Sequence, residues 1–351
     1  MRSFDYSTLK EKTWDHEIIS LIAQIHEYKG RQEVYLKQKP EELNKLVEIA
    51  KRQSTEASNA IEGIRTTNAR LKELCEEKTT PKNRDEEEIL GYRDVLNTIH
   101  ENYEYIPIRT NYILQLHRDL YKYTEKSIGG HFKISQNVIA AIDRNGKEYI
   151  LFTPLAPYET APAMDAICES YNKMIENDEL DAILLIPIFI HDFLCIHPFS
   201  DGNGRMSRLL TALLLYRSGY VVGKYISIES KIANNKDLYY KALEDCQSGW
   251  YDNDEDVTPF VKYMLRIILA AYRDFEERVE LLSEKLPAKE IVRRAIYSKM
   301  GKLSKSDISE LCPSIGVKSV ELALKQLVDE GVLEKKGLGR ATFYIRKDIN
   351  L

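Results

Sequence analysis

The stretch HPFSDGNGR, residues 197–205, brings together residue types that can act on a phosphate-containing group. Gly202 and Gly204 allow backbone conformations that other residues resist, so successive N–H groups at the start of a helix can converge on an anion. Asp201 can offer a hard oxygen to Mg2+, and the planar fork of Arg205 can neutralise the charge of a transferring group. This combination predicts a centre for phosphoryl-type transfer.

Two further side chains of this stretch complete the predicted centre. His197 is the only nearby group that could accept a proton near neutral pH, and Asn203 could donate a hydrogen bond to a phosphate oxygen. The alternative is a buried loop in which His197 is a hydrogen-bonded core residue and Asp201 only caps the next helix. We favour the transfer centre because a carboxylate, an amide, glycines and an arginine converge on one helix start.

Helices must position these residues. The apolar run AILLIPIFI predicts a helix over about 181–196 that leads into the turn, and RMSRLLTALLLYRSG predicts a second helix from near Arg205. Apolar residues three and four apart predict further helices at 21–30, 42–53, 86–103, 111–124 and 162–178. Between residues 138 and 152, Asn145-Gly146 separates two β-branched and aromatic runs, which predicts a hairpin. The expected fold is mainly α with a single hairpin in this part.

Composition limits the class of protein. The chain has 351 residues, 43% of them hydrophobic, and a formal net charge of −5, as expected of two or three domains with real cores and not of a wholly basic nucleic-acid binder. The longest apolar run is far shorter than the roughly 18 to 20 residues that span a bilayer. MRSFDYSTLKEK lacks the apolar core of a signal peptide. We therefore expect a cytoplasmic protein without a membrane partner. Five scattered cysteines without a CxxC pair predict neither a disulfide framework nor a zinc site.

The C-terminal segment, residues 289–351, differs in charge because it holds 13 Lys and Arg against 8 Asp and Glu residues. Three helical patterns are followed there by the hairpin pattern LEKKGLGRATFYIR. This order resembles a winged helix-turn-helix, which implies either DNA binding or protein docking. If DNA is the partner, Lys318, Lys325 and Arg340 are the expected phosphate contacts.

The twelve residues HPFSDGNGRMSR, 197–208, resemble the signature HxFx[DE]GNGRxxR of Fic-domain proteins, and the resemblance extends over about 45–275. It implies transfer of AMP from ATP to a Ser, Thr or Tyr hydroxyl of a target protein or of the enzyme itself. Fic-like kinases of the Doc type are similar but place lysine where Gly204 stands, so Gly204 favours AMP transfer. The implied roles are a base at His197, a Mg2+ ligand at Asp201, phosphate binding by Gly202, Asn203 and Gly204, and β- and γ-phosphate contacts by Arg205 and Arg208.

A second motif lies upstream, in QSTEASNAIEGIR. Ser58 and Glu62, followed by Gly63, resemble the inhibitory pattern [ST]xxxE[GN] of the same family, and the resemblance implies that Glu62 pairs with Arg208. The alternative is a surface helix that simply ends at Gly63. A carboxylate in a last helical turn faces the negative end of the helix dipole, at a cost of about 0.3 to 1 kcal/mol, unless a cation pairs with it. We therefore favour the inhibitory interpretation.

The expected architecture is an all-α Fic fold with a β-hairpin flap and a C-terminal winged helix domain. It divides into an N-terminal helical region with the inhibitory helix (1–105), a Fic catalytic core (106–275), a linker (276–288) and the winged helix domain (289–351). The expected function is a protein adenylyltransferase that uses ATP and Mg2+ and is inhibited by Glu62. Two alternatives stay open: a de-AMPylating hydrolase in which Glu62 positions water, and a nucleotide-sensing, DNA-binding regulator. The sequence also leaves open whether the chain forms a homodimer.

Overall fold

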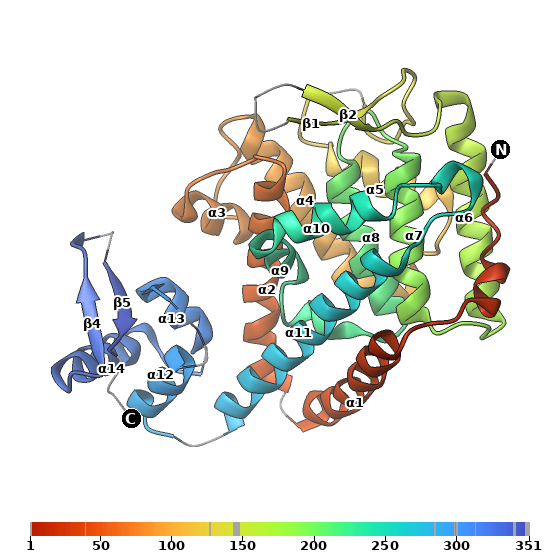
Figure 1. Cartoon of the computed structure of the whole chain (residues 1–351). Coiled ribbons are helices and arrows are strands. Elements are labelled where there is room, and N and C mark those ends of the chain that lie inside the picture. The colour runs from red at the N-terminus through yellow and green to blue at the C-terminus, as the bar shows by residue number, and fades with distance from the viewer. Residues whose placement is uncertain are drawn as a thin grey trace. The chain divides into compact units, whose positions relative to one another are not determined.

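The computed structural model describes residues 2–38, 40–125, 128–142, 148–283, 286–297, 299, 301–312, 314–339 and 342–347. The described residues are mainly helical, as predicted (Figure 1). They form two compact units, one of Met1–Lys29 with Ala50–Ala271 and one of Gly30–Ile49 with Tyr272–Leu351. No helix in the described ranges is both long and apolar enough to cross a membrane.

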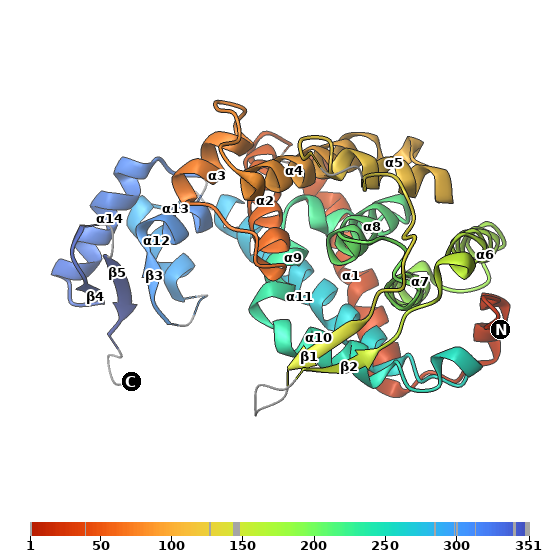
Figure 2. The same cartoon turned by 90° about the horizontal axis from the view of Figure 1, so that it is seen from above.

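The first unit is built from α-helices that surround a central pair, α7 and α8. In chain order the helices are α1 (His16–Gln38), α2 (Pro40–Ile61), α3 (Asn68–Cys75), α4 (Arg84–Asn102), α5 (Thr110–Leu120), α6 (Pro157–Glu176), α7 (Ala182–Ile196), α8 (Asn203–Arg217), α9 (Ile228–Asn234), α10 (Lys236–Asp245) and α11 (Thr258–Ser283). Parts of α1, α2 and α11 belong to the second unit. The helix α6 packs against α7, and α4 packs against α8 (Figure 2).

Both helices of the central pair are buried, α7 because its sequence is apolar on nearly every side, and α8 with polar residues such as Arg205 and Arg208 among its apolar ones. In α7 almost every residue from Ile183 to Ile196 is buried, as expected of a helix that is hydrophobic all round. In α8 every residue from Arg205 to Tyr216 is buried. The turn that carries the motif therefore joins two core helices and is fixed at both ends. The predicted helices on either side of the motif are confirmed.

The start of α6 differs from the prediction. The sequence pattern placed this start near Pro162, whereas the helix begins at Pro157, after the N-cap residue Ala156. Proline is favoured at the first helical position because its missing N–H would have no intrahelical partner there. Pro162 lies inside the helix. The pattern of apolar residues identified the body of the helix but not its first turn.

The predicted hairpin of the first unit consists of β1 (Ile139–Ile142) and β2 (Glu148–Phe152). The two strands pair antiparallel, with Ile142 opposite Glu148 and an irregularity between Ile139 and Ala140. The predicted turn at Asn145-Gly146 lies outside the described residues.

The second unit ends in three helices and a small sheet. Its elements after α11 are α12 (Ala288–Tyr297), β3 (Leu303–Ser304), α13 (Lys305–Leu311), α14 (Val317–Asp329), β4 (Leu333–Lys336) and β5 (Phe343–Arg346). The sheet is antiparallel, with β5 between β3 and β4. The sequence predicted the three helices and the β4–β5 pair but not β3. Residues 276–283, assigned to a linker above, are the end of α11. Arg340 lies outside the described residues.

Candidate active site

The motif turn has left-handed backbone at both ends. His197 ends α7 with φ of +51°, and its N–H donates to Phe193 O at 2.9 Å. Gly202, with φ of +85°, is the N-cap of α8. Positive φ costs little at glycine but is unfavourable at histidine, and such strained residues gather at functional sites. The surrounding structure must therefore hold the turn in place.

One support of the turn is His117 of α5. Its Nε2 donates to Asp201 O at 3.0 Å, and its Nδ1 accepts from Gly130 N–H at 3.0 Å. The ring also stacks on Phe199, with 3.7 Å between the centroids. These contacts fit only the neutral imidazole with its proton on Nε2, and burial lowers the pKa of His117 to about 4.

Other supports come from the segment before β1. The backbone N–H of Lys133 donates to Pro198 O at 2.9 Å, and its Nζ donates to Ile196 O at 3.0 Å. Asn137 Nδ2 donates to Phe199 O at 3.1 Å. Burial lowers the pKa of Lys133 to about 8. No local motif in the sequence shows that His117, Lys133 and Asn137 contact residues 60 to 85 positions away, so these supports were not predicted.

The side chain of Asn203 points elsewhere than predicted. Its Oδ1 accepts from Phe199 N–H at 2.9 Å and its Nδ2 donates to Phe199 O at 2.7 Å, and the residue is buried. The amide therefore closes the turn around Phe199, whose ring is fully buried. The backbone N–H of Asn203, in the first turn of α8, has no intrahelical acceptor.

His197 is arranged as a neutral proton acceptor. Its Nδ1 lies 3.2 Å from Leu194 O, and a carbonyl oxygen can only accept, so the proton is on Nδ1 and the lone pair on Nε2. Burial lowers the pKa of His197 to about 4. The imidazole is therefore uncharged at neutral pH, and the residue lines a cavity together with Asp201 and Gly204.

Three buried histidines and the partly buried His197 give the protein an expected pH dependence of stability. Burial lowers the pKa of His117, His191 and His197 to about 4 and that of His100 to about 3. An unfolded histidine titrates near 6.5, so below that pH the unfolded chain binds more protons than the folded one. We expect the free energy of unfolding to fall as pH falls from 7 to 5, by up to about 1.4 kcal/mol per histidine and pH unit. Urea midpoints that stay constant over this range would contradict the prediction.

The start of α8 is the predicted anion site. Asp201 Oδ1 accepts from Gly202 N–H at 2.7 Å. The N–H groups of Asn203, Gly204 and Arg205 follow in the first helical turn, where an α-helix offers them no intrahelical acceptor. Together with the positive end of the helix dipole they attract an anion to this end of α8.

Arg205 has two partners that its motif does not predict. Its Nη2 is 2.8 Å from Glu88 Oε2 of α4 and donates to Tyr121 OH at 2.7 Å. The guanidinium is 1% exposed, and its Nε and Nη1 are buried without a hydrogen-bond partner. Buried donors of this kind need an acceptor, and phosphate oxygens would provide it. Arg205 thus fits an anionic ligand while Glu88 fixes its orientation.

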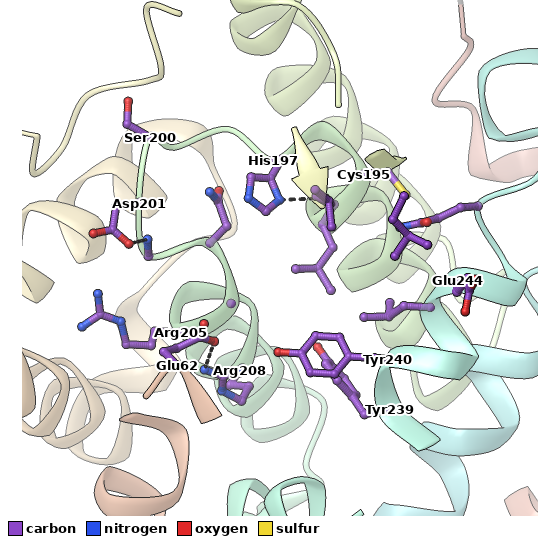
Figure 3. Close-up of a pocket in the computed structure, with 18 residues that line it drawn as sticks. Glu62, Cys195, His197, Ser200, Asp201, Arg205, Arg208, Tyr239, Tyr240 and Glu244 are labelled. Atoms are coloured by element: carbon purple, nitrogen blue, oxygen red, sulfur yellow. Dashed lines mark hydrogen bonds and ion pairs between the residues drawn. The ribbon is translucent and has the colours of Figure 1, made fainter. Parts of the chain in front are cut away.

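The two motifs meet at Arg208, as predicted. Arg208 Nη2 lies 2.7 Å from Glu62 Oε1 and 3.0 Å from Ser58 O, and its Nε donates to Ser58 Oγ at 2.8 Å. The carboxylate also lies against α8, because a Cβ placed on Gly204 would overlap Glu62 Oε1. Glu62 is therefore an anion of the chain itself, bound beside the helix start (Figure 3).

The motif residues line a cavity of about 260 Å3 whose other wall comes from α10. This wall includes Tyr239, Tyr240, Leu243 and Glu244, with Gln247 just after the end of α10, and the two strands add Ile139 and Leu151. The apolar and aromatic surfaces, with a few polar groups at the edge, are typical of a small-ligand pocket. The helical pattern of KDLYYKALED could have predicted α10 from the sequence, but no local signal places α10 at the motif.

In the described ranges, no three His, Cys, Asp or Glu side chains are grouped so that they could hold a metal ion by themselves. Mg2+ commonly binds through one or two carboxylates together with substrate phosphates. Asp201 lies at the start of the anion site, so the donors present fit Mg2+ only together with a bound phosphate.

The turn between α7 and α8 thus joins a neutral histidine to a helix start whose first N–H groups have no intrahelical acceptor. Residues 107–215 match the Fic/DOC family. The chain therefore carries a Fic/DOC domain in this region.

Solved structures share the fold. A Fic family protein from Desulfovibrio desulfuricans G20 aligns over 97% of this chain and 98% of its own, with a TM-score of 0.61 and 21% identity. A Fic domain containing signaling protein from Bacteroides thetaiotaomicron aligns over 75% of this chain and 97% of its own, with a TM-score of 0.60 and 25% identity.

Among curated proteins, the protein adenylyltransferase Fic of Drosophila yakuba is 28% identical over 236 residues. The match covers 64% of this chain and 43% of the relative. The chain thus spans less than half the length of this relative.

Proposed function

We propose that the chain is a protein adenylyltransferase, which transfers AMP from ATP to a Ser, Thr or Tyr hydroxyl of a target protein or of itself. The observation that carries the proposal is the neutral His197 in the same cavity as the helix-end anion site. The similarity to proteins named adenylyltransferase supports the same activity.

The chemistry follows from these groups. The target hydroxyl oxygen attacks the α-phosphorus of ATP, and His197 Nε2 takes the hydroxyl proton. The bond from the α-phosphorus to the bridging oxygen breaks, and pyrophosphate leaves. The first N–H groups of α8 and the unpartnered nitrogens of Arg205 would hold the charged oxygens. Because residue 204 is a glycine, the Glu62 carboxylate can lie against the start of α8. Any larger side chain at this position would overlap the carboxylate.

The nucleoside would bind against α10. Tyr239, Tyr240 and Leu243 offer flat and apolar surfaces for a purine, and Gln247 offers an amide for hydrogen bonds. This wall lies across the cavity from the motif turn (Figure 3). An ATP molecule with its base on α10 and its phosphates at α8 would present the α-phosphate near His197.

Asp201 would hold Mg2+ together with the phosphate oxygens, and the ion would neutralise charge on the leaving pyrophosphate. We expect Asp201→Ala to lower AMP transfer by about 10- to 100-fold and to remove most of its dependence on Mg2+ concentration. Ser200→Ala, in the same turn, is the control and keeps the parent response. If Asp201→Ala shows an unchanged Mg2+ titration, Asp201 is only a helix cap.

We further propose that Glu62 inhibits the enzyme by occupying Arg208. The carboxylate is 2.7 Å from the guanidinium that would contact the γ-phosphate, and it lies against the anion site. ATP could still bind, but with its phosphates misplaced for in-line attack. A de-AMPylating hydrolase is the second candidate function, favoured by the fact that Glu62 and His197 line one cavity, where Glu62 could position water.

The strands β1 and β2 are the proposed flap. A two-stranded sheet has unpaired outer edges, and an extended target segment could pair with one of them beside His197. Val138, Tyr149 and Ile150 expose apolar surface on this hairpin. These side chains would contact the residues that flank the modified hydroxyl.

For the C-terminal segment we propose a winged helix module over 289–351, in line with its three helices and hairpin. The exposed side of α14 carries Lys318 and Lys325 but also the apolar Val317 and Leu322. Glu321, on the same helix, pairs with Lys305. This mixed surface does not select DNA over a protein partner.

The proposed activity is tested by incubating the protein with ATP, Mg2+ and a cell lysate, followed by mass spectrometry of modified peptides. We expect hydroxyl side chains that carry the mass of one AMP, on target proteins or on the chain itself. Peptides that gain only a phosphate would instead indicate a kinase, and unmodified peptides in reactions with the Glu62→Gly protein would contradict the proposal.

A further inference from the structure

Lys236, the first residue of α10, contacts the end of the inhibitory helix. Its Nζ donates to Ile61 O at 2.7 Å, and Ile61 is the last residue of α2, directly before Glu62. The last carbonyl groups of an α-helix have no intrahelical donors, and a cation there also interacts favourably with the helix dipole. No Lys or Arg of α2 lies in its own last turn. Lys236 thus supplies the cation that the last turn of α2 lacks.

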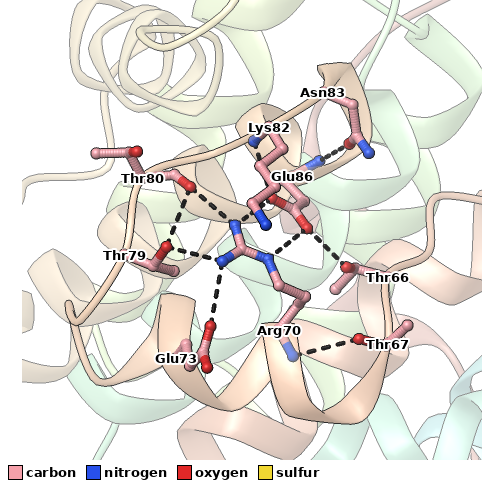
Figure 4. A network of polar contacts seen from close by, with 9 residues as sticks. All are labelled: Thr66, Thr67, Arg70, Glu73, Thr79, Thr80, Lys82, Asn83 and Glu86. Carbon is pink, nitrogen blue, oxygen red and sulfur yellow. Dashed lines mark hydrogen bonds and ion pairs between the residues drawn. The ribbon is translucent and has the colours of Figure 1, made fainter.

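The chain after Glu62 is held by a different helix, α4. Arg65 N–H donates to Asp85 Oδ2 at 3.2 Å, and Thr66 Oγ1 donates to Glu86 Oε1 at 2.9 Å. Arg70 binds Glu86 through Nε at 3.0 Å and Nη2 at 2.7 Å (Figure 4). The hydrogen bond from Arg70 lowers the pKa of Glu86 to about 2, so this carboxylate stays ionised.

These two anchors differ in strength. The α4 anchor is a network in which Glu86, 3% exposed, accepts several hydrogen bonds, including one from Lys82 N–H at 2.9 Å. The α10 anchor is one hydrogen bond from an exposed lysine. The weaker anchor is also nearer to Glu62 in sequence. Its helix carries Tyr239 and Tyr240, which line the cavity.

We infer that Lys236 is a positioning residue for inhibition: its ammonium holds the end of α2 so that Glu62 stays on Arg208. This inference rests on the proposed inhibitory role of Glu62. The amides that would report loosening are those of Glu62 and Ile64, which both donate to Asn59 O at 3.0 Å, and that of Gly63, which donates to Ala60 O.

The test uses the full chain with Lys236→Met, which keeps the apolar stem and removes the ammonium. We expect hydrogen exchange over residues 62–64 to become about two- to five-fold faster, as for loss of a cation at a helix C-terminus. AMP transfer should rise by the same factor. Lys241→Met is the matched control, because Lys241 lies on α10 but pairs with Asp245. Lys236→Arg, which keeps a charged donor, should behave like the parent.

Combination with Glu62→Gly separates this inference from the proposed function. In the Glu62→Gly protein, Lys236→Met should change transfer no further, because no carboxylate remains to be held. Exchange does not depend on catalysis, so it tests the anchor even if no variant transfers AMP. The inference would be overturned if hydrogen exchange of the amides of residues 62–64 were as slow in the Lys236→Met protein as in the Lys241→Met protein. An equal gain in transfer with and without Glu62 would also overturn it.

Discussion

Replacing His197 by Ala is expected to lower AMP transfer by about 100- to 10,000-fold, the usual contribution of a general base. The reason is geometric, since the bond from Nδ1 to Leu194 O at 3.2 Å leaves Nε2 as the acceptor in the cavity. The measurement is best made in the Glu62→Gly protein, where the parent rate is high enough for a large loss to be seen.

The His197→Ala protein should still fold and bind ATP, because the turn is held by His117, Lys133 and Asn137 and the anion site is at α8. Its circular dichroism and its affinity for ATP are the checks. His131→Ala replaces an exposed histidine that precedes the same segment and serves as the control. Transfer by His197→Ala at more than a tenth of the matched rate would exclude the role of base.

The second large effect is expected at Glu62. Glu62→Gly should raise AMP transfer, including self-modification, by about 100-fold, the cost that a small misplacement of reacting groups can carry. Removal of the carboxylate frees the Arg208 nitrogen that it binds at 2.7 Å. Arg208 itself stays anchored, because Ser58 Oγ and Ser58 O still accept its N–H groups. Glu62→Asp, with its shorter reach, should give a partial increase.

The controls for Glu62 test the pairing itself. Addition of Arg208→Ala to Glu62→Gly should remove most of the gain, since the freed guanidinium would be missing. Ser58→Ala loses one hydrogen bond to Arg208 but keeps the carboxylate, so it should raise transfer only slightly. Equal rates of the parent and Glu62→Gly proteins over a range of Mg2+ and protein concentrations would refute the inhibitory role.

The sequence predicted those parts of the site that lie within single motifs. The turn between two helices followed from the apolar runs on either side of HPFSDGNGR and from its glycines. The contact between Glu62 and Arg208, 146 positions apart, is present as expected. The cost of a carboxylate near the end of a helix favours pairing with a cation, and the resemblance to the inhibitory pattern implied that this cation is Arg208.

The remaining parts depend on which helices are neighbours, which periodicity does not encode. Glu88 is one of several acidic residues in α4, and only packing of α4 on α8 brings it to Arg205. Likewise, an apolar and aromatic face on α10 predicts burial, and only the fold turns Tyr239 and Tyr240 toward the cavity. The two hydrogen bonds between the Asn203 side chain and the backbone of Phe199 also depend on the folded turn and were not predicted from the sequence.

The central claim, AMP transfer to protein, is tested most directly by the position of the phosphate that reaches protein. The Glu62→Gly protein is incubated with ATP labelled on the α-phosphate and, in parallel, with ATP labelled on the γ-phosphate. We expect only the α-label to become bound to protein, with release of pyrophosphate, and the His197→Ala substitution to remove nearly all of it. Transfer of the γ-label, or no bound label with either nucleotide, would contradict this claim.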